Sequence, residues 1–260
     1  MNFNNLFVIA GPCVIESAEV SLTVARHVKG VCERLGIGYI FKASFDKANR
    51  SSSGSFRGPG MEAGLAVLER VKREVGVPVL TDVHESDQAE RVGEVVDVLQ
   101  VPAFLARQTD LLLACGRTGK TINVKKGQFM SPAEMSLVVD KIRSTGNSKI
   151  LLTERGTFFG YNRLVNDFTG LAVMKSLGVP VVFDITHSTQ QPAGLGNTSG
   201  GSPQYSPLLA RAAVAAGVDG LFLECHPDPR NAKSDAATML GLGEVEGILR
   251  DAVKIRGALR

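Results

Sequence analysis

The stretch MEAGLAVLERVKREVGVPVLTDVHES, residues 61–86, contains one complete repeat of a helix followed by a strand. The apolar side chains of residues 61–75 fall on one helical stripe, and the charged side chains lie off it. A glycine turn then leads into VPVL at 77–80, a short continuous apolar run typical of a parallel strand covered on both faces. The polar segment TDVHES follows the strand. This order of helix, turn, strand and polar loop predicts an α/β fold.

Apolar runs of this size recur along the whole chain, and a stretch with helical period follows each of them. The eight runs lie at 7–10, 39–41, 77–80, 98–101, 122–124, 150–152, 181–183 and 221–223. Eight such units in about 250 residues have the size of a TIM barrel. We therefore expect a single (β/α)8 TIM barrel over residues 1–260, since no linker marks a second domain. An open doubly wound sheet is the alternative, although its early glycine fingerprint is missing.

The composition excludes several classes of protein. Apolar residues make up 44% of the 260 residues and charged residues 21%, as in a folded globule. The formal net charge of +3 is too small to indicate a nucleic-acid partner. No apolar stretch reaches the about 18–20 residues of a membrane span, and the run at 7–10 lacks the basic flank of a signal peptide. Four widely spaced cysteines fit a reducing compartment, so we expect a cytoplasmic protein.

Residues that can take part in catalysis or metal binding follow the predicted strands. This is the end of the barrel where enzymes of this fold have their active sites. Seven of the eight segments after the strands carry an ionisable or metal-binding residue, whereas the turns from helix to strand are ordinary glycine turns. For any single charged residue, a solvated loop is the better explanation. The asymmetry between the two ends of the barrel nevertheless predicts an enzyme.

Cations dominate this end of the predicted barrel. Lys42, Lys125 and Arg155 end strands, where a side chain can enter the barrel mouth and then requires an anion. Few acidic residues lie close to them in the sequence, so we expect the anion to be a ligand with phosphate or carboxylate groups. Because Lys125 and Lys126 must face opposite sides of a strand, we expect Lys125 to point inward, with Gln128 nearby.

Four residues of metal-binding type follow strands one, seven and eight, which are neighbours in a closed barrel. They are Cys13, His187, Glu224 and Asp235. A thiol, an imidazole and two carboxylates suit zinc, iron, manganese, cobalt or a similar divalent metal cation. Each residue alone has a simpler interpretation, because a lone cysteine is usually buried in a core and an aspartate often caps a helix. His226 is an alternative to His187.

Several longer motifs also occur in order along the chain. They are FKASFDKANRSS (41–52), SFRGPG (55–60), TDVHE (81–85), PAFLARQTDL (102–111), NVKKGQF (123–129), TERG and FGYN (153–162), DITHS (184–188) and HPDP (226–229). In these motifs the chain resembles the 3-deoxy-D-manno-octulosonate 8-phosphate synthase family. Members of that family are TIM barrels, typically homotetramers, that condense phosphoenolpyruvate with D-arabinose 5-phosphate and release phosphate for lipopolysaccharide synthesis. The resemblance therefore implies a transferase with these two small-molecule substrates.

The resemblance also implies roles for individual residues. The residues implied to hold phosphoenolpyruvate are Lys42, Lys47, Lys125, Gln128 and Arg155. The residues implied to hold the sugar phosphate are Asn49, Arg50 and Ser51, with Arg107 reaching in from a neighbouring subunit. His84, which is flanked by Asp82 and Glu85, is a candidate for moving a proton or placing the attacking water.

Metal-independent members of the family carry Asn in place of Cys13 and often Pro in place of Gly127. The chain therefore resembles the metal-dependent branch. It departs from the family pattern at Ser53 and Gly54, where Ile-His is usual, and in the segment after Asp235. Three alternatives stay open at this point. One is 3-deoxy-D-arabino-heptulosonate 7-phosphate synthase, which typically has KPRTS in place of KANRSS; the others are a non-catalytic phosphosugar-binding barrel and a Schiff-base aldolase that uses a rim lysine.

Overall fold

The computed structural model describes residues 3, 5–49, 54–192, 194 and 199–259. Eight parallel strands among them form a ring, in which each strand pairs with the next along the chain and β12 pairs with β1 to close the barrel. The strands are β1 (Phe7–Gly11), β2 (Gly38–Lys42), β3 (Val79–Asp82), β4 (Val98–Val101), β5 (Thr121–Lys125), β6 (Ile150–Glu154), β9 (Val181–Asp184) and β12 (Gly220–His226). All eight predicted strands are confirmed.

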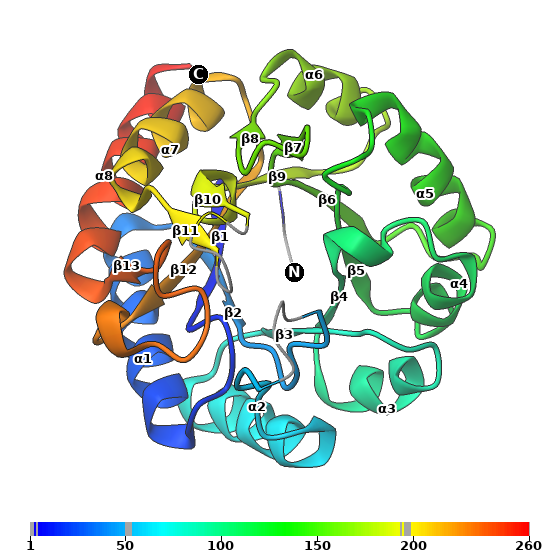
Figure 1. Cartoon of the computed structure of the whole chain (residues 1–260), viewed down its shortest axis with the longest axis horizontal. Coiled ribbons are helices and arrows are strands. Elements are labelled where there is room, and N and C mark those ends of the chain that lie inside the picture. Colours follow the sequence, from blue (N-terminus) through cyan, green and yellow to red (C-terminus); the bar gives the residue numbers. More distant parts are fainter. Residues whose placement is uncertain (1–2, 4, 50–53, 193, 195–198, 260) are drawn as a thin grey trace.

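Eight α-helices in the described residues surround this ring, as Figure 1 shows from one end of the barrel. They are α1 (Ala18–Leu35), α2 (Met61–Val75), α3 (Gln88–Val95), α4 (Thr109–Arg117), α5 (Met135–Arg143), α6 (Thr169–Lys175), α7 (Ser206–Ala215) and α8 (Leu242–Ala258). The predicted (β/α)8 barrel is therefore confirmed. No helix of the described residues combines the length and the apolar character needed to cross a membrane.

Local sequence signals set the helix ends and faces. At the start of α1 the Ser17 hydroxyl accepts a hydrogen bond from the Val20 amide, and Gly36 ends the helix with a left-handed φ of 65°. In α2 the predicted stripe faces the barrel, with Leu65, Leu68 and Val71 buried. A helix of this length is only marginally stable on its own in water, so burial of the stripe against the strands stabilises α2.

Side chains alternate between the inside of the barrel and the layer beneath the helices, as the two-residue period of a strand requires. The inner apolar cluster comprises Phe7, Ile9, Ile40, Leu80, Val98, Leu151, Val182 and Phe222. Space is tight around the Phe7 ring, because a Cβ atom at Gly220 would lie 2.6 Å from it. Gly11 is equally constrained, since a Cβ there would overlap the carbonyl oxygen of Lys42.

Towards the carboxyl ends of the strands the inward positions become polar. Phe222 is the last inward apolar residue of β12, and Glu224 is the next inward residue. Three short pairings lie beyond the strand ends: β7 (Thr157–Phe158) with β8 (Leu164–Val165), β10 (Gln190–Gln191) with β11 (Gly200–Gly201), and β13 (Leu240–Gly241) with β12. The inward side chains are therefore apolar in the middle of the barrel and polar at the carboxyl ends of the strands, where the site lies.

Candidate active site

A cavity of about 690 Å³ opens at the carboxyl ends of the strands. Most of the side chains predicted to act together line it. These are Lys42, Lys47, Asn49, Asp82, His84, Lys125, Gln128, Arg155, His187 and Asp235. They come from six strands, β2, β3, β5, β6, β9 and β12, and the loops that follow those strands. The fold therefore brings together chemically active residues that are widely separated in the sequence.

Lys42 is almost completely buried, and carboxylates of the protein neutralise it. Its Nζ donates to Glu224 Oε1 at 2.7 Å and to the Cys13 carbonyl oxygen at 2.9 Å, and it lies 3.9 Å from Asp82 Oδ2. The expectation that the rim cations lack internal acidic partners is therefore wrong. It failed because Glu224 is distant in sequence yet lies two strands from Lys42 around the closed ring.

Lys125 points into the barrel, as predicted, and it also has an internal partner. Its Nζ donates to Asp184 Oδ2 at 2.7 Å and lies 3.7 Å from the centre of the Phe222 ring. Asp184 Oδ2 is also 2.7 Å from His187 Nδ1, so one carboxylate orients both the lysine and the imidazole. Burial lowers the pKa of Lys125 from its ordinary value, although Asp184 opposes this.

A chain of hydrogen bonds crosses four neighbouring strands and ends at Asp82. Thr153 Oγ1 donates to Asn123 Oδ1 at 2.7 Å, Asn123 Nδ2 donates to Gln100 Oε1 at 2.8 Å, and Gln100 Nε2 donates to Asp82 Oδ1 at 2.6 Å. On its other oxygen, Asp82 lies 3.8 Å from Lys47 Nζ. Although burial acts in the opposite direction, the nearby lysines hold the pKa of Asp82 well below its usual range.

Arg155 and Gln128 keep hydrogen-bonding capacity in the cavity. Arg155 Nη2 donates to Gln190 Oε1 at 2.6 Å, whereas the buried Arg155 Nη1 and Gln128 Oε1 have no hydrogen-bond partner among the described residues. A buried guanidinium with an unused donor is suited to a phosphate or carboxylate ligand. An anionic ligand is therefore still supported, and Arg155 is its best-supported contact.

The predicted metal residues come together at the seam between β1 and β12. Ligand atoms of Cys13, Glu224 and Asp235 all lie within 4.8 Å of one another. His187 Nε2 lies 3.5 Å from Glu224 Oε2 and 3.8 Å from Asp235 Oδ2. The alternative histidine, His226, instead lies 3.6 Å from a Glu16 oxygen and contacts the Asp228 backbone, so the geometry favours His187.

Three features of these residues fit a bound cation. Glu224 Oε2 is buried without a hydrogen-bond partner among the described residues. Cys13 and Asp235 adopt left-handed backbone angles, with φ of 62° and 51°, a strain that clusters at functional sites. Burial and then the Glu224 charge raise the pKa of the Cys13 thiol far above its ordinary value, so the thiolate requires a compensating cation. A thiol, an imidazole and two carboxylates form a donor set suited to a divalent transition metal.

The remaining predicted residues fall into two groups. His84 packs edge-on against Phe45, its Nδ1 is buried without a hydrogen-bond partner among the described residues, and burial lowers its pKa. Asn49 also reaches the cavity. Arg50 and Ser51, by contrast, lie outside the residues that the structure describes.

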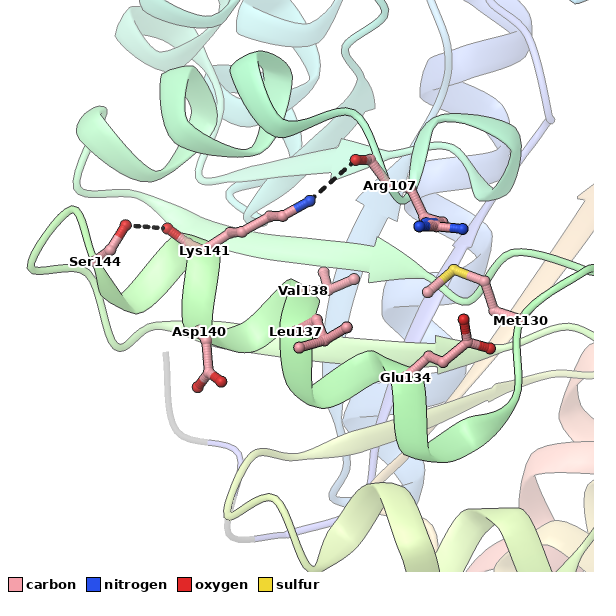
Figure 2. Close-up of a pocket in the computed structure, with 8 residues that line it drawn as sticks. All are labelled: Arg107, Met130, Glu134, Leu137, Val138, Asp140, Lys141 and Ser144. Carbon is pink, nitrogen blue, oxygen red and sulfur yellow. Dashed lines mark hydrogen bonds between the residues drawn. The ribbon is translucent and has the colours of Figure 1, made fainter.

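Arg107 does not line the cavity of its own barrel. It lines a second pocket, of about 410 Å³, together with Met130, Glu134 and Leu137. Figure 2 shows its guanidinium pointing towards Met130 and Glu134, while Lys141 Nζ donates to the Arg107 carbonyl oxygen at 3.2 Å. Within one chain, Arg107 is therefore separate from the other predicted substrate contacts.

Several residues of the site were not singled out from the sequence. Asp184 ends β9 and pairs with Lys125, and the rule that selected the other strand ends applies to it equally. Gln100 and Asn123 interrupt otherwise apolar runs, which is the signal that could have found them. A polar side chain inside a buried strand requires a buried partner, and here the partners are each other and Asp82.

Comparison with known proteins matches residues 2–258 to the DAHP synthetase I family. The chain is 56% identical over 254 residues to the 2-dehydro-3-deoxyphosphooctonate aldolase of Synechococcus sp., covering 98% of this chain and 89% of that protein. The proteins of the same name from Cyanothece sp. and Acidithiobacillus ferrooxidans are 58% and 57% identical over 251 and 244 residues. Those matches cover 96% and 94% of this chain, and 92% and 87% of the two relatives.

Proposed function

Because this chain belongs to the DAHP synthetase I family, we propose that it condenses phosphoenolpyruvate with D-arabinose 5-phosphate and water. The products are 3-deoxy-D-manno-octulosonate 8-phosphate, a precursor of lipopolysaccharide, and inorganic phosphate. The name shared by the similar relatives favours this transferase over the seven-carbon synthase. The observation that carries the proposal is one cavity lined by Arg155 with its unused donor, by buried lysines and by His187 and Asp235, with Cys13 and Glu224 next to Asp235.

The proposed substrate placement is the one that the family resemblance implies, and the cationic side chains of the cavity support it. In this proposal Lys42, Lys47, Lys125, Gln128 and Arg155 hold the carboxylate and phosphate of phosphoenolpyruvate. The sugar phosphate is held by Asn49, Arg50 and Ser51. Lys42 and Lys125 already pair with Glu224 and Asp184, whereas Arg155 keeps an unused donor for the ligand.

The bond changes balance without a further reactant. Carbon 3 of phosphoenolpyruvate attacks the sugar aldehyde, positive charge develops at carbon 2, and water adds there before phosphate departs. The preorganised lysines and Arg155 stabilise the negative oxygens. His84, whose lowered pKa favours the neutral imidazole at neutral pH, faces the same cavity and accepts a proton or places the water, beside the ionised Asp82.

Cys13, His187, Glu224 and Asp235 would hold a divalent metal cation, zinc, iron, manganese, cobalt or similar, as the resemblance to the metal-dependent branch implies. When bound there, such an ion supplies Lewis-acid chemistry, polarising the sugar aldehyde or orienting the water. Asp184 orients the His187 ring through Nδ1 and leaves Nε2 directed at the two carboxylates. The orphaned Glu224 oxygen and the strained Cys13 and Asp235 backbones support this assignment.

The assay that tests the proposal measures phosphate release from phosphoenolpyruvate with arabinose 5-phosphate or erythrose 4-phosphate as acceptor. We expect turnover with the five-carbon sugar and little with the four-carbon sugar. Oxygen label in the ester position of phosphoenolpyruvate should leave with phosphate. Retention of the label in the sugar product, or trapping of an adduct by borohydride, would contradict the scheme and favour a Schiff-base route.

We further propose that the whole chain acts as one catalytic domain in a cytoplasmic homotetramer. All four cysteines are free and buried, which supports a reducing compartment. The position of Arg107 in a pocket beside the exposed Leu137 supports a contact with a neighbouring subunit, whose sugar phosphate Arg107 would reach. Light scattering tests the mass. Mixing an Arg107→Ala variant with a Lys125→Met variant tests the shared site, because mixed oligomers should regain activity.

A further inference from the structure

Lys126 is a fully buried cation directly after β5, and it does not line the cavity. Its Nζ donates to the Gly127 carbonyl oxygen at 3.2 Å, to the Met130 carbonyl oxygen at 3.1 Å and to Thr157 Oγ1 at 3.1 Å. An ammonium group has three donors, so these contacts use all of them. Burying a charge in this way is costly, and nothing in the proposed chemistry uses it directly.

The counter-charge for Lys126 comes from the next strand. Glu154 Oε1 lies 3.7 Å from Lys126 Nζ and accepts hydrogen bonds from the backbone amides of Arg155 and Gly156, at 2.9 and 2.6 Å. Burial lowers the pKa of Lys126 and raises that of Glu154, so each group requires the other to stay charged. The pair thus joins the ends of β5 and β6 from outside the barrel.

The two segments joined in this way carry inward-facing substrate contacts. Gln128 lies within the segment 127–130 that Lys126 binds at both ends, and the Phe158 amide donates to the Gln128 carbonyl oxygen at 3.1 Å. Arg155 directly follows Glu154, whose carboxylate binds the Arg155 amide. One buried pair therefore fixes the backbone from which both Gln128 and Arg155 extend.

We propose that Lys126 is a positioning residue for phosphoenolpyruvate, acting through the backbone of Gln128 and Arg155 rather than by touching the substrate. This inference rests on the proposed function. Lys126 links the loop after β5 to Thr157 in β7, so loss of Lys126 removes its contacts with both segments together. Binding of the sugar phosphate, assigned to the loop after β2, does not depend on this link.

The test compares Lys126→Met, Lys126→Arg and Thr157→Val in steady-state assays with both substrates varied. Misplacement by about 1 Å costs up to about 100-fold, so we expect Lys126→Met to raise KM for phosphoenolpyruvate by about 10- to 100-fold. KM for arabinose 5-phosphate should stay unchanged. Lys126→Arg should recover part of the loss, and Thr157→Val should shift the same constant less. Thr157→Val carries the test if Lys126→Met does not fold.

The matched control is Lys149→Met, which removes an exposed lysine that donates to the Gly119 carbonyl oxygen at the opposite end of the barrel. It should change neither constant. In a Gln128→Ala background, Lys126→Met should have a smaller effect on KM for phosphoenolpyruvate than it has alone. One of the two side chains that Lys126 positions is already missing there. Equal rises in both KM values, or no rise in a folded variant, would overturn the inference. Absence of phosphate release by the wild-type enzyme would instead contradict the proposed function.

Discussion

Cys13 and Asp235 stand 222 positions apart in the sequence, yet the Cys13 Sγ lies 3.1 Å from Asp235 Oδ2, and both residues have a left-handed backbone. Such angles cost non-glycine residues about 1–3 kcal/mol each. The surrounding structure sustains this cost at two of the four candidate metal ligands. With these angles, the Cys13 thiol and the Asp235 carboxylate lie close to Glu224, and the Asp235 carboxylate also lies 3.8 Å from His187 Nε2.

The substitution Cys13→Asn should abolish stable metal binding while keeping the fold. Asn tolerates a positive φ better than most residues, so the backbone at this position is preserved. Metal content per chain, measured by elemental analysis, should fall from near one to near zero. Cys225→Ala is the matched control, because Cys225 faces the helix layer and its loss should leave the metal content unchanged.

Activity after exhaustive chelation gives the same test in the wild-type enzyme. Turnover should disappear with the metal and return when a divalent ion is added back. Full turnover by verified metal-free protein would falsify the metal requirement and leave Cys13 as a dispensable buried thiol.

Replacing Arg155 by alanine should weaken binding of phosphoenolpyruvate. Loss of one buried hydrogen bond to a charged ligand costs about 1.5–3 kcal/mol, which is about 10- to 100-fold in affinity. KM for phosphoenolpyruvate should rise by that factor while KM for the sugar phosphate changes little. The control is Arg163→Ala, which removes an exposed arginine between β7 and β8. This variant should behave as wild type. A selective rise in KM for the sugar would show that the two substrates are assigned the wrong way round.

Asp184→Asn should lower stability in a manner that depends on pH. Burial opposes ionisation, but His187 and Lys125 outweigh it and hold the pKa of Asp184 well below its usual range. The unfolded chain binds this proton near pH 4, so the stabilisation is complete above about pH 5 and declines as pH falls towards the lower folded pKa.

Breaking a buried pair costs about 3–5 kcal/mol, so denaturation with urea should show that deficit for Asp184→Asn at pH 7. The deficit should shrink below about pH 4, where the unfolded wild-type chain binds a proton at Asp184 while the folded carboxylate stays ionised. Asp140→Asn, at an exposed position on α5, should change stability by no more than about 0.5 kcal/mol. A deficit that stays constant from pH 7 to pH 3 would contradict this account.

Gly11→Ala should destabilise the barrel strongly, because the new Cβ would overlap the carbonyl oxygen of Lys42. Backbone atoms cannot move aside cheaply, so we expect a loss of about 3 kcal/mol or more in the free energy of unfolding. Gly247→Ala adds the same methyl group at an exposed position of α8 with no atom within 4 Å, and should instead stabilise by up to about 1 kcal/mol. Equal effects of the two substitutions would show that the overlap is relieved at little cost.

The strands were predictable because both faces of the barrel sheet are covered. Strands buried on both faces are continuous apolar runs, such as Val98–Val101. The position of Lys125 in the cavity followed from the two-residue period of a strand. The meeting of Cys13 with Glu224 followed from the adjacency of the first and last strands in a closed ring. These features depend only on patterns that repeat within or between neighbouring elements.

The ion pairs of the mouth could not be predicted in the same way. Lys42 and Glu224 are 182 positions apart and Lys125 and Asp184 are 59 apart, so their contact depends on strand register and rotamer. The left-handed angle at Cys13 is likewise invisible in a sequence, because only glycine marks such positions in advance. Sequence therefore indicated where the charged groups gather but not how they neutralise one another.

The pairing of β1 with β12 also bears on how the enzyme is made by the ribosome. Cys13 is synthesised before Glu224 and Asp235, which lie 211 and 222 positions further along the chain. A nascent chain that lacks β12 has no closed ring and cannot assemble the four candidate ligands. Closure of the ring therefore requires β12, and the proposed metal site also requires Asp235 beyond it, so a chain terminated before Asp235 would not capture the ion.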